Sequence, residues 1–423
     1  MRLYNTLTRS LDELPPAPGP VRMYFCGPTV YARSHVGNAR PFVLGMWLRR
    51  WLREVGYDVK LVHNITDVND KIYEAAPGQS AELAARATEW YLQDTRDLGL
   101  GDPDHWPKVT EHIPEIVGFI AALVETGHAY AVEGDVYFRV ASYPEYGALS
   151  RQRPDQVEEQ EPNPLKEDPR DFALWKANKP GEDTFWDSPW GRGRPGWHIE
   201  CSAMAEALLG PVFEIHGGGL DLVFPHHENE LAQSRSLGHE FAQIWTHNGM
   251  LEFGGVEMHK SVGNDVSLRN VIDTWGRETV LTFFLTGHWR KPIDFTDKTM
   301  NAARARADRF REVFRGPSEL APPGEWARFA AALGEDFNTP EALAVLHEWR
   351  DHDLLRRALD LFGLASLAES RDAPAEIVSL AERRSAARDQ RDFEQADRLR
   401  AEIEAQGWDV RDAADGFQLV PRS

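Results

Sequence analysis

Val21-Arg22-Met23-Tyr24-Phe25-Cys26 is the stretch that decides the fold, because it has the composition of a buried strand and Gly27-Pro28 ends it. Helical spacing of apolar residues follows over 42–52, and residues 58–64 predict a second strand. A strand, a helix and a second strand so close in sequence form a βαβ unit, which predicts an α/β domain with a parallel sheet. Cys26 then lies at the carboxyl end of a strand, where such sheets present their ligand sites.

The rest of the chain divides around this unit. Residues 80–130 indicate helices, whereas a strand at 134–138 and an acidic, proline-rich stretch at 157–169 indicate an insertion. The α/β core resumes with a strand at 212–216 and a helix from about Glu228. Helical patterns then run from 298 to 366, and a polar linker leads to a charged helical segment (375–406) and a short strand-like end.

Composition sets limits on function. The 423 residues carry a formal charge of −20, which argues against a general nucleic-acid coat but not against a local basic surface. Five arginines between Arg304 and Arg315 are equally compatible with a solvated helix face and with an RNA-backbone contact. No apolar run approaches the roughly 20 residues of a membrane span, and the N-terminus lacks the pattern of a signal peptide. A cytoplasmic protein is expected.

The two cysteines, Cys26 and Cys201, are far apart, and two buried spectator thiols are the ordinary expectation. Their neighbours change it. Residues 226–230 supply His-His-Glu-Asn-Glu, and Zn²⁺ prefers thiolate, imidazole and carboxylate ligands in a tetrahedron. His226 and Glu230 share one face of a helix because they are four residues apart. The spacing predicts a candidate zinc site, with His227 as an alternative to His226 and a capping cluster at the surface as the alternative to a site.

Two short motifs suggest a nucleotide. His35-Val36-Gly37-Asn38 precedes the first helix, where a small residue lets a phosphate approach backbone N–H groups and His35 can donate a hydrogen bond. Much later, residues 257–264 form a loop in which Lys260 can neutralise phosphate charge. Each motif alone is weak, and the zinc ligands alone would equally suggest a zinc hydrolase.

In order along the chain, however, the motifs make it resemble the class I cysteinyl-tRNA synthetases almost from end to end. The stretches that carry the resemblance are Leu3-Tyr4-Asn5-Thr6-Leu7-Thr8, Met23-Tyr24-Phe25-Cys26-Gly27-Pro28-Thr29-Val30-Tyr31, Asn64-Ile65-Thr66-Asp67, Gly196-Trp197-His198-Ile199-Glu200-Cys201-Ser202-Ala203-Met204, His216-Gly217-Gly218-Gly219-Leu220-Asp221, Phe224-Pro225-His226-His227-Glu228-Asn229-Glu230 and Asp336-Phe337-Asn338-Thr339-Pro340-Glu341-Ala342. Several are long and specific to the family.

The resemblance implies a Rossmann-type catalytic domain with an insertion, followed by an α-helical bundle and a small C-terminal domain. The implied boundaries are 1–116 and 193–250 for the catalytic domain, 117–192 for the connective insertion, 251–297 for a linking fold with the lysine loop, 298–368 for the bundle and 375–423 for the anticodon-reading domain. The implied activity is ATP-dependent activation of L-cysteine and its transfer to the 3′ end of tRNA(Cys), with Mg²⁺ accompanying ATP. A monomer is expected.

Site residues follow from the resemblance position by position. It implies one zinc ion per chain, held by Cys26, Cys201, His226 and Glu230, and it therefore selects His226 over His227. The implied catalytic and ATP-binding residues are His35, Gly37, Asn38 and Lys260. The implied substrate pocket consists of Gly27, Thr29, Asn64, Thr66, Trp197, His216 and Asp221. Zinc would select the thiolate of cysteine over the hydroxyl of serine, which is a much poorer ligand.

The match departs from the family at a few positions. Asn38 replaces a histidine, Glu257 a lysine and His259 a serine, and Pro41 stands where a hydroxyl residue is common. A negative charge at Glu257 is unfavourable near phosphates. An inactive paralogue that binds RNA or a partner is therefore one alternative. Another is a cysteine ligase of mycothiol biosynthesis, which resembles the catalytic half but typically ends after the bundle, whereas residues 375–423 continue here.

Overall fold

A four-stranded parallel sheet forms the centre of the computed structural model, which describes residues 1–153, 161–257, 266–369, 373–413 and 416–421. Its strands are β3 (Pro20–Phe25), β4 (Asp58–His63), β9 (Val212–Gly219) and β10 (Phe241–Asn248), in the order β10-β9-β3-β4. Helix α1 (Val36–Glu54) makes the crossover from β3 to β4. The strand order reverses between β3 and β9, and ligands bind at such a switch point. The predicted α/β fold is confirmed.

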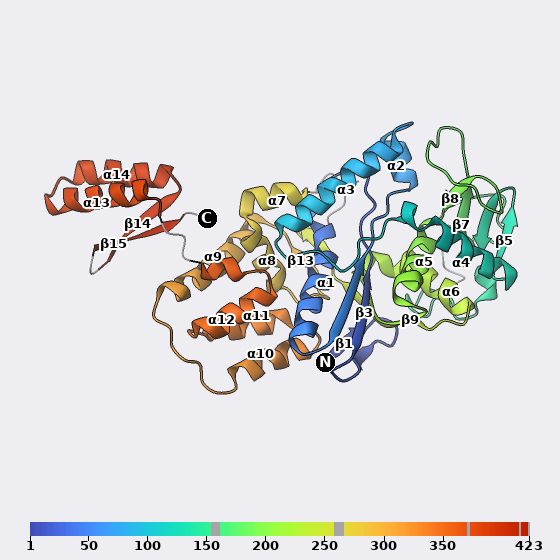
Figure 1. The fold of residues 1–423 in the computed structure, drawn as a ribbon, viewed down its shortest axis with the longest axis horizontal. Coiled ribbons are helices and arrows are strands. Elements are labelled where there is room, and N and C mark those ends of the chain that lie inside the picture. Colours follow the sequence, from blue (N-terminus) through green and yellow to red (C-terminus); the bar gives the residue numbers. More distant parts are fainter. Residues whose placement is uncertain (154–160, 258–265, 370–372, 414–415, 422–423) are drawn as a thin grey trace.

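Two hydrophobic cores cover the two faces of this sheet. Phe25 and the apolar side of α1 belong to a core shared with the helical bundle. Tyr24 and Cys26 point the other way, into a core shared with the insertion and with α5 (Trp197–Leu209). Alternate residues of one strand thus enter different cores, as the period of a strand requires. Figure 1 shows the bundle and the insertion on opposite sides of the sheet.

A long segment separates β4 from β9, and the insertion predicted at 117–192 lies within it. Its elements are α2 (Asp70–Ala75), α3 (Ser80–Asp97) and α4 (Ile113–Glu125), then an antiparallel sheet of β5 (Ala129–Val132), β6 (Asp135–Phe138), β7 (Phe172–Ala177) and β8 (Gly193–Pro195). The helical pattern predicted for 80–130 is interrupted after Asp97, because Gly99 and Gly101 take positive φ angles of 71° and 84°.

Helix α6 (Glu228–Ser236) lies between β9 and β10 in the chain, and the other elements form four groups. The chain from β10 continues through β11 (Leu251–Phe253), β12 (Val256–Glu257), α7 (Leu268–Trp275), α8 (Arg277–Thr286) and β13 (Ile293–Asp294). The bundle consists of α9 (Asp297–Arg315), α10 (Glu325–Gly334), α11 (Thr339–Glu348) and α12 (His352–Leu361). A C-terminal unit contains α13 (Ala375–Asp389), α14 (Phe393–Ala405), β14 (Trp408–Ala413) and β15 (Gly416–Pro421), while the hairpin of β1 (Arg2–Asn5) and β2 (Ser10–Glu13) packs beside β10.

The arginines of α9 are partly neutralised by their own helix. Arg311 pairs with Asp308 at 2.7 Å, and Arg315 pairs with Glu312 at 2.7 Å. Arg304 instead lies over the ring of Trp275, 4.7 Å from its centroid. An RNA contact of this helix stays a prediction. Among the described residues, no helix has both the length and the apolar composition needed to cross a membrane.

Candidate active site

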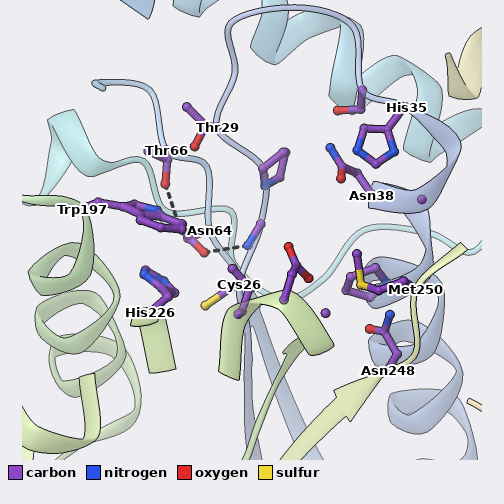
Figure 2. A pocket seen from close by; sticks show the side chains of 18 of the residues that line it. Cys26, Thr29, His35, Asn38, Asn64, Thr66, Trp197, His226, Asn248 and Met250 are labelled. Carbon is purple, nitrogen blue, oxygen red and sulfur yellow. Dashed lines mark hydrogen bonds between the residues drawn. The ribbon is translucent and has the colours of Figure 1, made fainter. Parts of the chain in front are cut away.

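The carboxyl ends of the four parallel strands open into one cavity of about 440 Å³. Cys26 follows β3, Asn64 follows β4, Gly219 ends β9 and Asn248 ends β10, and all four line the cavity. Figure 2 shows Cys26, His226 and Trp197 on one side of it and His35, Asn38 and Met250 on the other. The cavity therefore has a sulfur-and-imidazole wall and a wall at the start of α1.

The sulfur-and-imidazole wall fits a tetrahedral metal. Cys26 Sγ lies 3.7 Å from Cys201 Sγ and 3.8 Å from Glu230 Oε1, and His226 Nε2 lies 3.1 Å from Glu230 Oε1. Zinc bonds of ~2.3 Å to sulfur and ~2.0 Å to nitrogen or oxygen place tetrahedral ligands roughly 3.3–3.8 Å apart. All four side chains are buried. The donor types and the spacing both match a Cys₂-His-carboxylate site.

A second set of donors shares two of these ligands. Cys26 and Glu230 also lie within reach of His216 and His227. The two sets differ in their access to the cavity, because Cys26, Cys201 and His226 line it, whereas His216 and His227 do not. The first set, which contains His226, is therefore the better fit for a metal that must meet a substrate.

Burial dominates the electrostatics of this wall. It raises the pKa of the Cys26 thiol well above its usual value, and the neighbouring Cys201 and Glu230 raise it further. Burial also raises the pKa of Glu230 to about 7, against the opposing effect of His226, and lowers the pKa of His226. Burial of the Cys26 thiol and the Glu230 carboxyl side by side disfavours their charged forms, and a bound cation reverses that preference.

The predicted substrate residues differ in their access to the cavity. Gly27, Thr29, Asn64, Thr66, Trp197 and Asp221 line it. His216 does not line the cavity. It is fully buried, and its Nε2 lies 2.7 Å from Glu230 Oε2, so any effect of His216 on a substrate would pass through that carboxylate. Trp197 stacks on His226 at 4.3 Å between ring centroids and thereby fixes the plane of the imidazole.

The floor between β3 and β4 requires a glycine. A Cβ on Gly27 would lie 1.7 Å from the carbonyl oxygen of Asn64. The Gly27 N–H donates to Asn64 Oδ1 at 2.9 Å, and Thr66 Oγ1 donates to Glu200 Oε2 at 3.1 Å. Glu200 was not among the predicted site residues, although it directly precedes Cys201. Burial raises its pKa well above the usual value.

The opposite wall is built by the start of α1. His35 is the residue before the first helical turn, which contains no acidic side chain. A Cβ on Gly37 would lie 2.9 Å from the His35 ring, so glycine is needed for this ring position. Free N–H groups and the helix dipole make such a terminus suited to phosphate. Gly37 and Asn38 also line the cavity, whereas Lys260 and His259 lie outside the described residues.

Both flanks of the lysine-loop segment are attached to this wall. Downstream, the Val36 N–H donates to Val266 O at 2.9 Å, and His35 pairs with Ser267 in an antiparallel bridge. Upstream, the buried Arg40 guanidinium donates to the carbonyls of Gly249 and Met250. The same guanidinium also donates to the carbonyls of His288 and Lys291, which follow the segment in the chain. Arg40 was also not predicted, because its partners are backbone carbonyls that leave no pattern in the sequence.

Comparisons with known proteins agree with this geometry. Residues 14–305 match the family model for the tRNA synthetases class I (C) catalytic domain, and residues 328–358 match the DALR domain. Among curated relatives, the chain is 43% identical to the cysteine–tRNA ligase of Alkalilimnicola ehrlichii over 98% of both chains. It is 44% identical to that of Jannaschia sp. over 100% of this chain and 97% of the relative.

A likeness to solved structures supports the fold. Mycobacterium tuberculosis methionyl-tRNA synthetase in complex with methionyl-adenylate aligns with a TM-score of 0.58 at 16% identity, covering 82% of this chain and 88% of that one. The catalytic-domain match spans most of the chain, and the relatives match nearly all of it. The chain belongs to the cysteine–tRNA ligase family of class I aminoacyl-tRNA synthetases.

Proposed function

We propose that this chain joins L-cysteine to tRNA(Cys) in two steps within the one cavity. In the first, a carboxylate oxygen of cysteine attacks the α-phosphorus of ATP, and the bond to the bridging oxygen breaks to release pyrophosphate. In the second, a ribose hydroxyl at the tRNA 3′ end attacks the carbonyl carbon, its proton is lost, and the bond to AMP breaks. One observation supports this proposal most. A wall with thiols and an imidazole faces the start of helix α1 across a single cavity.

Cys26, Cys201, His226 and Glu230 would hold a zinc ion, which supplies a soft Lewis acid for a thiolate and a poor one for a hydroxyl. Trp197 keeps the His226 ring in place, and Asp221 at the rim would attract the cysteine ammonium group. Discrimination by a bond that serine cannot form reaches several orders of magnitude. This proposal accounts for a chain in which both cysteines lie at the same site.

Little covalent chemistry falls to the protein in the first step, so position and phosphate charge dominate. His35, the Gly37 N–H and the Asn38 side chain would bind the triphosphate, together with Lys260 and Mg²⁺, whereas the Asn38 N–H already donates to His35 O at 3.0 Å. Asn38 donates a hydrogen bond without carrying a charge. The division of the chain into 1–116 with 193–250, 117–192, 251–297, 298–368 and 375–423 goes with this proposal, the last unit reading the anticodon.

Cysteine-dependent ATP–pyrophosphate exchange tests the first step, and transfer to tRNA(Cys) or to glucosaminyl-inositol tests the second. We expect exchange with cysteine, little with serine, and transfer to tRNA. Exchange followed by transfer to the amino sugar alone would identify a mycothiol-type ligase instead. A chain that holds zinc but supports no exchange would be an inactive paralogue.

A further inference from the structure

Lys71 is a cation at the cavity that the two walls leave unexplained. Among the described residues that line the cavity, it is the one lysine or arginine. We propose that Lys71 binds the phosphodiester that precedes the 3′-terminal nucleoside of the tRNA and so orients the ribose for the transfer step. This assignment rests on the proposed function and extends it to a residue of the second step.

The side chain of Lys71 is held at the cavity but is not neutralised. Its Nζ lies 5.8 Å from the ring centroid of Tyr31, which also lines the cavity. An aromatic ring attracts a cation and so orients the lysine side chain, but it carries no negative charge that would neutralise the ammonium group. No ion pair joins Lys71 to a carboxylate within the part of the chain that the structure describes. Lys71 is exposed, so it meets an incoming polyanion before any deeper residue does.

The neighbouring acid is already engaged elsewhere. Asp70 Oδ2 accepts from Lys176 Nζ at 3.0 Å, and Asp70 also pairs with the buried Arg194. The two cations compensate the Asp70 carboxylate, which therefore does not compete for Lys71. The backbone of Lys71 is fixed as well, because its N–H donates to Asn69 Oδ1 at 3.2 Å at the start of α2. A fixed main chain with an unpaired, four-carbon side chain suits a mobile phosphate.

The position of Lys71 favours tRNA over ATP. The triphosphate wall is the start of α1, where His35 and Asn38 lie across the cavity from Thr66 and Trp197 (Figure 2). Lys71 follows Thr66 closely along the chain and lies in α2, which contacts the insertion through the ion pair of Asp70 with Lys176. The ribose that attacks the aminoacyl carbon must enter over this side, since the zinc wall holds the cysteine. Its preceding phosphodiester then lies at the mouth of the cavity, where Lys71 and Tyr31 are.

The test separates the two steps in Lys71→Met, Lys71→Arg and a matched control, Lys179→Met. Lys179 is an exposed lysine between β7 and β8 that neither lines the cavity nor belongs to the arginine-rich helix α9, so its loss changes the net charge equally. Pyrophosphate exchange reports the first step. Single-turnover transfer from preformed cysteinyl-adenylate, at tRNA concentrations below saturation, reports the second. Zinc content is measured for each variant.

We expect Lys71→Met to keep exchange within about twofold and to slow transfer about tenfold, the effect of one charge-assisted contact. The slope of log rate against log salt should become shallower by about 0.7–0.9, as for one lost phosphate contact. Lys71→Arg should restore most of the transfer rate, and Lys179→Met should match the unaltered chain.

Two results would overturn the assignment. A parallel loss of exchange in Lys71→Met would place Lys71 on ATP or on cysteine. Unchanged transfer with an unchanged salt slope would show that the lysine contacts no phosphate. Failure of the proposed function gives a different result, because the unaltered chain itself would then lack cysteine-dependent exchange.

Discussion

Replacing Arg40 by methionine tests what holds the cavity wall at the start of α1 in place. The Arg40 side chain is almost fully buried, and its guanidinium donates to the carbonyls of Gly249, Met250, His288 and Lys291. Burial lowers its pKa to about 9, which leaves it charged at neutral pH. Gly249 and Met250 line the cavity, so Arg40 connects α1, whose start is the proposed phosphate site, to the segment that follows β10.

The magnitude follows from the acceptors. Three of the four carbonyls keep another donor, whereas Lys291 O has none among the described residues. An orphaned buried carbonyl costs about 1–3 kcal/mol, and each lost bond to a charged donor adds to this. Removal of the buried cation offsets part of the loss. We therefore expect Arg40→Met to destabilise the catalytic domain by about 3 kcal/mol.

Thermal unfolding followed by calorimetry measures this effect. At ~2–4 °C per kcal/mol for a domain of this size, the main transition should fall by about 6–12 °C. Arg40→Lys should fall less, because an ammonium keeps the charge but cannot reach all four carbonyls. In the folded fraction, KM for ATP should rise while KM for cysteine and zinc content stay the same. If the main transition falls by less than about 2 °C, or if both KM values rise equally, Arg40 does not hold the start of α1 in the way described.

The other predictions concern the floor and the metal. Cys201→Ser should lose zinc and the preference for cysteine over serine together, which metal analysis and exchange with each amino acid measure; unchanged metal content would contradict the ligand set. Chelation of the unaltered chain should abolish cysteine-dependent exchange, and added Zn²⁺ should restore it. Gly27→Ala should lose activity and stability, because its Cβ would meet Asn64 O at 1.7 Å; a stable, active variant would show that the floor can shift. Trp197→Ala should raise KM for cysteine more than KM for ATP, since Trp197 contacts His226 and not the α1 start; equal effects would exclude a selective role.

Much of the fold could be predicted because buried parallel strands are continuous apolar runs. The stretch around Phe25 and the strand before Asn64 are of this kind. The break between α13 and α14 could not be predicted, because it occurs at Arg391, which has a φ of 60° without being glycine. The helical segment predicted for 375–406 is therefore two helices.

The candidate site shows the same division. Spacing could not choose between His226 and His227, because Phe224 has extended dihedral angles and the irregular turn buries both rings. Access to the cavity separates them, which is a property of the fold and not of the spacing. His216 was predicted as a substrate residue near the zinc-bound sulfur, and this role stays a prediction; the structure places it against Glu230, with His216 Nε2 2.7 Å from Glu230 Oε2. Contacts of this kind depend on which side chain lies nearer to the cavity.

The C-terminal unit has a hydrophobic core of its own. Its buried cluster consists of Ile377, Leu380, Ala381, Leu399, Ile403 and Val410, none of which belongs to the cores that cover the sheet. A bond from Arg411 to Glu312 at 2.9 Å links it to α9, and Figure 1 shows the unit at one end of the molecule, next to the bundle. Such a unit opens as a separate foldon, and its amides should exchange with solvent at a lower free energy than those of β3. The C-terminal unit can therefore unfold locally while the packing around Cys26 stays intact.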